Sequence, residues 1–135
     1  MESRPTDIFY KDDVITAFIA SRWYMHNPGH VLIIPNEHIE NIYSMTGSLS
    51  DRIHRFEIEV AKALKEVYQC DGVSSRQHNE PAGDQEVWHY HQHVFPRYTN
   101  DKLYTAKSNP TTAEQRMSYA DQLGRYFMGK SNLYV

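Results

Sequence analysis

Three histidines at alternate positions, His89, His91 and His93, form the most unusual spacing in this chain, within the stretch HYHQHVFPRY. In an extended strand, side chains at alternate positions point to the same face, so the three imidazoles would share one surface. Imidazoles can bind metals, exchange protons near neutral pH and act as nucleophiles. The stretch therefore predicts either a polar strand face without a task, a metal site or an anion site.

A metal site is disfavoured by the distance between the outer histidines. Alternate residues of a strand lie roughly 6.6 Å apart, so His89 and His93 would be about 13 Å apart. A tetrahedral ion with bonds of about 2.1 Å cannot gather all three imidazoles from a straight strand, and would need an outside ligand such as His30 or His78. Cys70 is the single cysteine, which excludes a cysteine-rich zinc site. A zinc site is therefore the least favoured of the three interpretations, and we assign no residue as a metal ligand.

An anion site centred on His91 uses all three histidines. A neutral imidazole, with an ordinary pKa of about 6.5, is a competent nucleophile when its other nitrogen donates to a fixed acceptor. A phosphoryl centre suits this nucleophile, because neighbouring donors can meet the charge on its oxygens. The preceding segment NEPAGDQ adds uncharged donors: Asn79, Gln85 and the backbone amides around Gly83.

Two apolar runs and one amphipathic pattern predict the elements in front of this segment. VITAFIAS (Val14–Ser21) and HVLIIP (His30–Pro35) are typical of strands covered on both faces, and HNPG (His26–Gly29) is typical of the turn between them. From Ser50 to about Gln69, apolar residues recur at spacings of three and four, which predicts a helix. Its apolar stripe comprises Ile53, Phe56, Val60, Leu64 and Val67.

The second half of the chain predicts a hairpin and a final helix. Gly72–Asn79 and Val87–Pro96 read as strands joined by the loop Glu80–Gln85, with Trp88 and Tyr90 on the buried face of the second strand. Thr111 and Glu114 resemble a capping box at the start of a helix over residues 111–128. This order of elements favours the α+β class, in one domain over residues 1–135.

The overall composition excludes several classes of protein. The chain has 135 residues, 40% of them hydrophobic, with a formal net charge of −3. A nucleic-acid polymer is not expected as a partner, because such proteins usually carry a concentrated basic face. No signal peptide and no run of 18 apolar residues is found, so we expect a cytoplasmic protein without a membrane span.

Two blocks of the sequence together resemble the histidine triad (HIT) family. HYHQHVF fits the family's pattern of three histidines alternating with hydrophobic residues, and NEPAGDQEVW precedes it as the family's Asn, Gly and Gln loop does. PGHVLIIPNEHIENIY, over residues 28–43, is similar to the family's upstream block. The resemblance covers a core at about residues 8–104 and implies a HIT-like fold, with a five-stranded antiparallel sheet, a long helix and a homodimeric assembly. It also implies hydrolysis or transfer at the α-phosphate of nucleotides, including nucleoside phosphoramidates and dinucleoside polyphosphates.

The same resemblance implies a role for each histidine of the site. His91 would attack the α-phosphorus and form a nucleotidyl-histidine intermediate, which water then resolves. His93 would bind a phosphate oxygen and assist the leaving group, while His89 and His30 would orient the cluster. No cofactor is implied for this chemistry.

The substrate-binding residues implied by the resemblance include two departures from the family pattern. Asn79, Gln85 and Gly83 would hold the phosphates. Glu86 stands where many members carry a small hydroxyl residue, and could donate a proton to the leaving group or repel a polyphosphate. Ala20 stands where the family commonly has an acid that receives the ribose hydroxyls.

The missing ribose acid leaves a second function open. Trp23 or Tyr24 could shape the base pocket instead of that acid, or could be ordinary loop aromatics. With Ala20 and Glu86 in place, the protein could also be a module that binds a nucleotide or a partner without efficient catalysis.

Overall fold

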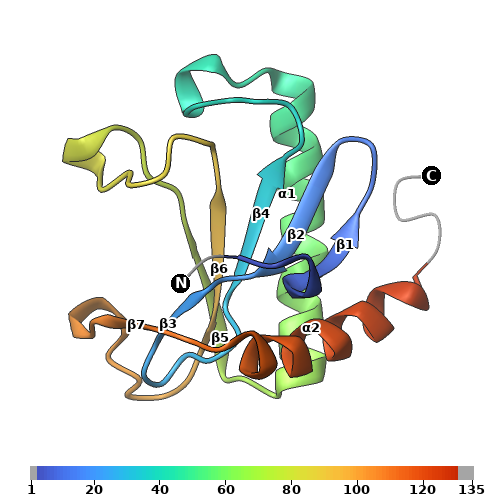
Figure 1. Cartoon of the computed structure of the whole chain (residues 1–135), viewed down its shortest axis with the longest axis vertical. Helices are drawn as coiled ribbons and strands as arrows, with labels where there is room; N and C mark the ends of the chain where they lie inside the picture. The colour runs from blue at the N-terminus through green and yellow to red at the C-terminus, as the bar shows by residue number, and fades with distance from the viewer. Residues whose placement is uncertain (1–2, 131–135) are drawn as a thin grey trace.

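The computed structural model describes residues 3–130, and a five-stranded antiparallel sheet is its largest element (Figure 1). In spatial order the strands are β1 (Ile8–Lys11), β2 (Ile15–Ile19), β4 (Val31–Pro35), β6 (Gln92–Arg97) and β5 (Gly72–Arg76). A second small sheet pairs β3 (Arg22–Tyr24) with β7 (Ser108–Pro110). The helices are α1 (Gly47–Ala63), which continues through a π turn η3 (Leu64–Tyr68), and α2 (Ala113–Met128). The predicted α+β class, with its five-stranded antiparallel sheet and two helices, is confirmed.

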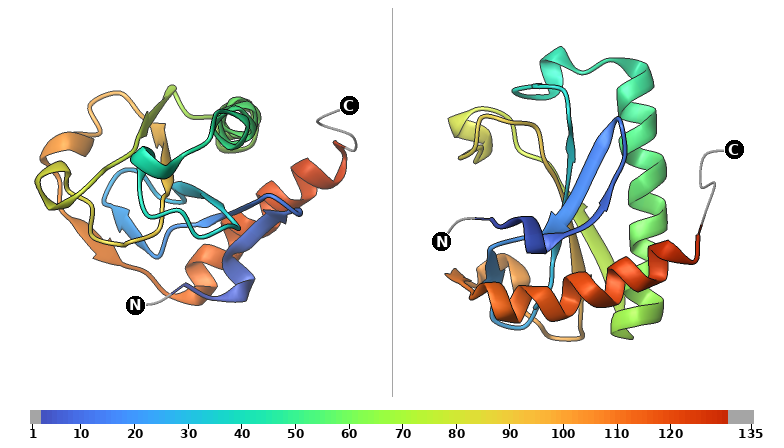
Figure 2. Two further views of the ribbon diagram at one scale, coloured as in Figure 1. Left: turned by 90° about the horizontal axis from the view of Figure 1, so that it is seen from above. Right: turned by 45° about the vertical axis from the view of Figure 1, so that its right-hand side comes forward.

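Helix α1 covers one face of the sheet (Figure 2). It begins at Thr46, whose hydroxyl accepts a hydrogen bond from the Leu49 amide. The predicted stripe is buried at Ile53, Phe56 and Val60, which join the sheet in one hydrophobic core. Burying such side chains is worth about 1.5–3 kcal/mol each. The helix therefore fixes which face of the sheet is core and which face stays open.

Strand β4 shows how the two faces differ. Val31 and Ile33 are buried in the core, whereas the alternate residues Leu32 and Ile34 are only partly buried. Leu32 and Ile34 line a cleft on the open face. The prediction that this apolar run is covered on both faces is therefore wrong for the second face.

Helix α2 starts one residue later than the capping pattern predicts. Thr112, not Thr111, is the N-cap, and its capping-box partner is Gln115 rather than Glu114. The Thr111 hydroxyl instead donates to the Ser21 carbonyl, which ties the start of α2 to the small sheet. The helix lies across the end of the sheet, against β1 and β2 (Figures 1 and 2).

The histidine-bearing strand is shorter than expected. β6 begins at Gln92, not at Val87. The segment before it is hydrogen-bonded to the residues that follow β4 rather than to a strand of the sheet, because the Tyr90 amide donates to the Ile39 carbonyl. Tyr90 is buried as predicted, but Trp88 is 47% exposed. β5 likewise ends at Arg76 rather than Asn79. The hairpin pairing of β5 with β6 is present, with a longer connection than predicted.

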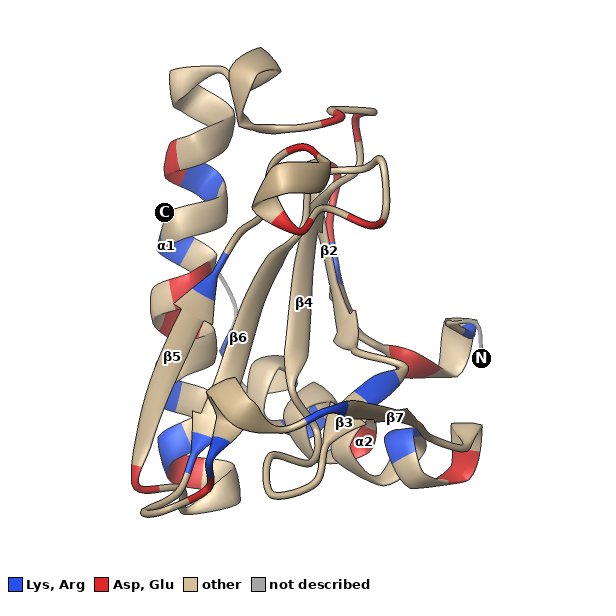
Figure 3. Cartoon of the chain, turned by 90° about the vertical axis from the view of Figure 1, so that its left-hand side faces the viewer, with Lys and Arg blue, Asp and Glu red and all other residues tan. Residues whose placement is uncertain are grey.

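The charged residues of the described chain are spread unevenly over the open face. Figure 3 shows acidic positions in the loop around η4 (Pro81–Gly83), and basic positions on β3 and at the end of β5. Neither helix within residues 3–130 is long and apolar enough to cross a membrane.

Candidate active site

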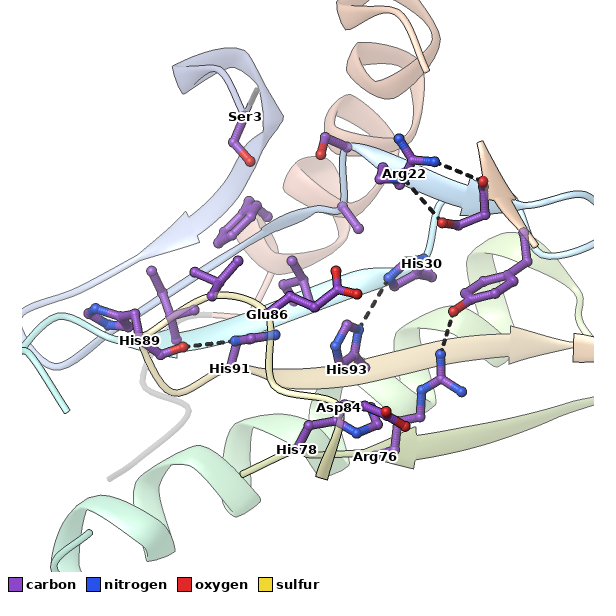
Figure 4. A pocket seen from close by; sticks show the side chains of 18 residues that line it. Ser3, Arg22, His30, Arg76, His78, Asp84, Glu86, His89, His91 and His93 are labelled. Carbon is purple, nitrogen blue, oxygen red and sulfur yellow. Dashed lines mark hydrogen bonds between the residues drawn. The ribbon is translucent and has the colours of Figure 1, made fainter. Parts of the chain in front are cut away.

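A cleft of about 560 Å³ opens on the face of the sheet opposite α1 (Figure 4). Its apolar wall comes from β2 and β4, through Phe18, Leu32 and Ile34. Its polar wall is a cluster of five histidines: the three of the triad, together with His30 and His78. The predicted grouping of His30 with the triad is present in the fold, although His30 comes just before β4 and the triad spans the start of β6.

His91 has one nitrogen fixed and one nitrogen free. Its Nδ1 lies 2.8 Å from the backbone carbonyl oxygen of His89, which can only accept a hydrogen bond. The proton is therefore assigned to Nδ1, and the lone pair to Nε2. Burial lowers the pKa of His91, although the hydrogen bond to His89 opposes this shift. No hydrogen bond to Nε2 is found within residues 3–130, so this nitrogen can act as a nucleophile.

His93 and His30 form a buried pair beside His91. His93 Nδ1 lies 3.4 Å from His30 Nε2, and the His93 ring centroid lies 5.0 Å from that of His91. The Phe95 ring packs against the rings of His93 and His30, and its plane is nearly parallel to that of His93, at an interplanar angle of 3°. Burial lowers the pKa of His30 to about 3 and that of His93 to about 2, with the charge of Arg76 adding to both shifts. Both imidazoles are therefore neutral at cellular pH.

This neutral pair predicts that acid destabilises the fold. The unfolded chain takes up protons on His30 and His93 below about pH 6.5, whereas the folded chain resists them. Stability is then complete above pH 6.5 and falls as the pH is lowered towards the folded pKa values, by up to about 1.4 kcal/mol per pH unit for each histidine. Urea unfolding between about pH 5 and pH 7 measures this slope.

A matched pair of variants assigns the slope to the buried histidines. His30→Gln should flatten the pH dependence of unfolding, whereas His54→Gln, on the exposed face of α1, should leave it unchanged. An unfolding free energy that stays constant over this range in the unmodified protein would contradict the neutral pair.

His89 occupies the end of the cleft nearest the β4 carboxyl terminus. Its Nε2 donates to the Pro35 carbonyl at 2.8 Å, and its ring lies against that of His38. In addition, its backbone carbonyl holds His91. His89 can therefore orient the neighbouring histidine without itself touching a reacting atom.

The predicted phosphate-binding loop is folded on itself. Gln85 is 4% exposed, accepts from the Glu80 amide and donates to the carbonyls of Glu40 and Val87. The amides of Gly83 and Gln85 both donate to the Glu80 carbonyl. These groups are engaged in the described conformation, so they shape the loop rather than face the cleft.

Asn79 is engaged as well, and its neighbour His78 takes the place beside the triad. The Asn79 carboxamide accepts from the Ile42 amide and exchanges hydrogen bonds with Gln77. His78 lines the cleft, donates from Nδ1 to the Gly83 carbonyl, and places its ring 5.7 Å from that of His93. The sequence suggested His78 only as an outside ligand for a metal, whereas the structure brings it into the histidine cluster.

Two aromatic residues near the missing ribose acid separate in the fold. Trp23 is buried, donates to the Ala20 carbonyl and packs against Tyr119 in the core. Tyr24 lines the cleft, as do Ala20 and Glu86. Of the two aromatic candidates for the substrate pocket, Tyr24 alone is therefore a cleft residue.

Among residues 3–130, no group of three His, Cys, Asp or Glu side chains is placed to hold a metal. Cys70 is buried at the end of the helix, with its thiol against the Leu64 carbonyl.

Comparison with known proteins identifies relatives of similar size. The HIT domain model matches residues 2–100. The protein named hit of Bacillus subtilis is 32% identical over 94 residues, which cover 70% of this chain but 63% of that protein's length. The purine nucleoside phosphoramidase of Escherichia coli is 34% identical over 94 residues, covering 67% of this chain and 76% of the enzyme.

A solved structure gives the same result for the fold. The crystal structure of a Hit-like protein from Bartonella henselae, described as involved in cell-cycle regulation, superposes with a TM-score of 0.78 at 28% identity. The alignment covers 90% of this chain and 87% of that one. Because the domain model spans well over half of the chain and both sequence relatives exceed 30% identity, this protein belongs to the histidine triad (HIT) family.

Proposed function

We propose that the protein hydrolyses, or transfers the nucleotidyl group of, nucleoside phosphoramidates or dinucleoside polyphosphates at the α-phosphate. The observation that carries the proposal is the state of His91: Nδ1 donates to a backbone carbonyl, and Nε2 is left with its lone pair in the cleft. The lowered pKa keeps this nitrogen unprotonated at neutral pH.

The proposed reaction has two steps at phosphorus. The Nε2 lone pair of His91 forms a bond to the α-phosphorus, while the bond from phosphorus to the leaving group breaks and the leaving group keeps that electron pair and gains a proton. Water then attacks the same phosphorus, the N–P bond breaks, and His91 recovers its lone pair. An alcohol or phosphate in place of water would make the reaction a transfer. His93, whose ring lies 5.0 Å from that of His91, is the imidazole that would bind a phosphate oxygen.

The cleft has room and suitable walls for a nucleotide. Its volume of about 560 Å³ falls within the usual range of small-molecule sites. Phe18, Leu32 and Ile34 provide an apolar wall against which a base or ribose can pack. The E. coli relative, a purine nucleoside phosphoramidase, supports this class of substrate.

The assembly and the cellular location of the protein are two further parts of the proposal. We expect a homodimer, which light scattering of the purified protein tests, and a cytoplasmic location, which cell fractionation tests. The exposed edge strand β5 offers a place where two sheets can join.

A binding module without efficient catalysis is the second candidate. It is favoured by Ala20, which leaves this part of the cleft wall without a carboxylate for the ribose hydroxyls. Nucleotides would still fit the apolar wall under this alternative, but no covalent intermediate would form.

Trapping the intermediate distinguishes the two candidates. Adenosine 5′-phosphoramidate carrying a labelled phosphate should leave label on the protein when the reaction is stopped within one turnover under conditions that avoid acid. The label should appear on His91 in a mass spectrum of the peptides. Binding of labelled AMP without any adduct or turnover, across phosphoramidates, dinucleoside polyphosphates and nucleotide sugars, would reject the enzyme and favour the module.

A further inference from the structure

Arg76 lies in the cleft beside the histidine cluster, although nothing in the histidine motif includes it. It is the last residue of β5, and the β5–β6 register places it directly opposite His93. Its side chain lines the cleft and extends past His93 towards Tyr24 (Figure 4). Arg76 therefore stands on the side of His93 that is away from His89.

The positive charge of Arg76 has no directly paired carboxylate in the described part of the chain, although Asp84 and Glu86 line the same cleft. No ion pair joins Arg76 to a carboxylate within residues 3–130, whereas other arginines of the fold, such as Arg97 and Arg116, pair with aspartates. The charge reaches the histidines, since it contributes to the low pKa of His30 and His93. A partly buried charge without a counter-ion is costly, so the site gains when an anion enters.

The hydrogen-bonding capacity of Arg76 is also largely unused. A guanidinium has five N–H donors, and one hydrogen bond is found here, from Nη2 to the Tyr24 hydroxyl at 2.7 Å. Its Nε is buried without a hydrogen-bond partner in the described part of the chain. A residue that only braced β5 against β3 would not need a charge, because its one acceptor is a neutral phenol.

Aromatic rings hold the guanidinium in place. Its central carbon lies 4.6 Å from the centroid of the Phe95 ring and 5.4 Å from that of Tyr24. Phe95 is the same ring on which His93 and His30 rest. The guanidinium is therefore preorganised at a fixed place relative to the histidines, and an anion can bind it without ordering a long side chain.

Arg22 enlarges the basic end of the cleft. It lines the cleft from β3 and is held by two hydrogen bonds to Ser108 on β7. Its guanidinium forms no ion pair within residues 3–130 either. The cleft thus has an apolar wall, a central row of imidazoles and an end with two arginines, while the carboxylates of Asp84 and Glu86 also line it (Figure 4).

We propose that Arg76 binds an anionic group, a carboxylate or a phosphate, on the leaving-group portion of the substrate. The assignment rests on the proposed function, with the α-phosphorus at His91 and the leaving group towards His93. A substrate positioned in this way directs its departing group to the basic end. Arg76 then selects for leaving groups that carry a negative charge beyond the bond that breaks.

A matched set of substrates tests the assignment. Adenosine 5′-phosphoramidates made with glycine and with glycinamide have leaving groups that differ in one carboxylate, and ADP supplies a phosphate leaving group. The unmodified protein should favour the glycine compound over the glycinamide compound in kcat/KM by about 10- to 100-fold. Relative efficiency with ADP shows whether phosphate is accepted as the anion as well as carboxylate.

Substitutions then test whether Arg76 is the source of the preference for the glycine compound. Arg76→Gln should reduce the ratio of glycine to glycinamide efficiency to near one, mainly through loss on the glycine compound. Tyr24→Phe removes the hydrogen bond but keeps the guanidinium, and should retain the preference. Arg55→Gln, the same substitution on the exposed side of α1, serves as the matched control and should leave the ratio unchanged.

Each failure has a separate meaning. If the unmodified protein turns over the glycinamide compound but shows no preference for glycine, the Arg76 assignment is rejected and the proposed function stands. If Arg76→Gln lowers both substrates equally, Arg76 positions the site and does not select the leaving group, which also overturns the assignment. If no compound is turned over, the proposed function is rejected and the assignment with it.

Discussion

Replacing His91 with alanine should lower kcat for adenosine 5′-phosphoramidate by about 10³-fold or more, because the substitution removes the proposed nucleophile. The cleft walls and the other histidines remain in place, so a nucleotide should still bind within a few-fold of its original dissociation constant. Single-turnover kinetics measures the loss in rate, and equilibrium dialysis with labelled AMP measures the retained binding.

A matched histidine variant separates the site from general effects of the substitution. His54→Ala removes an imidazole from the exposed face of α1, where its nearest charged partner is Glu57 at 4.0 Å, and should leave kcat unchanged. Among residues 3–130 the His91 side chain makes a single hydrogen bond, so its replacement should change the unfolding free energy little. Turnover by His91→Ala within tenfold of the unmodified protein would reject the mechanism.

The sequence carried enough information for the α+β class and the histidine grouping because both depend on local periodicity, whereas the five-stranded sheet was implied by the resemblance to the HIT family. Spacings of three and four predicted α1 and its buried face, and alternation predicted that His89, His91 and His93 share one surface. β6 begins only at Gln92 and the chain bends over residues 87–89, yet His89 and His91 still line the cleft together with His93.

The loop before the triad could not be predicted in the same way, because its side chains are directed by contacts with distant segments. Gln85 binds the carbonyl of Glu40, and Asn79 binds the amide of Ile42. Glu40 and Ile42 are about forty positions away in the sequence, in the segment that follows β4. Residue type alone therefore suggested phosphate donors, whereas the fold uses the same groups to join two loops.

Arg76 and His78 illustrate a third kind of signal, which depends on strand register. Arg76 is opposite His93 because Gly72 pairs with Arg97, and that register cannot be read from a connection as long as the one between β5 and β6. Once the register is known, the alternation of Arg76 and His78 places both beside the triad. An arginine two residues before a histidine, upstream of a histidine motif, was the available signal.

A buried ion pair far from the cleft holds the amino-terminal segment and α2 together. Arg116 and Asp7 are both fully buried, with Arg116 Nε 2.8 Å from Asp7 Oδ1. The guanidinium also donates to the carbonyl and the hydroxyl of Thr111, and Asp7 accepts from the Arg4 amide. This network joins the segment before β1 to the start of α2.

Arg116→Met should therefore destabilise the protein by about 3–5 kcal/mol, because it leaves the Asp7 carboxylate buried without its counter-charge. Urea unfolding measures the loss as a lower midpoint at a similar slope. The matched control is Arg55→Met, which breaks the exposed pair with Asp51 and should cost less than about 1 kcal/mol. The double variant Asp7→Ala with Arg116→Met removes both charges and should recover part of the stability lost in Arg116→Met alone. If the two arginine variants lose equal stability, or if the double variant is destabilised by the sum of both single changes, the network does not act through the buried charge pair.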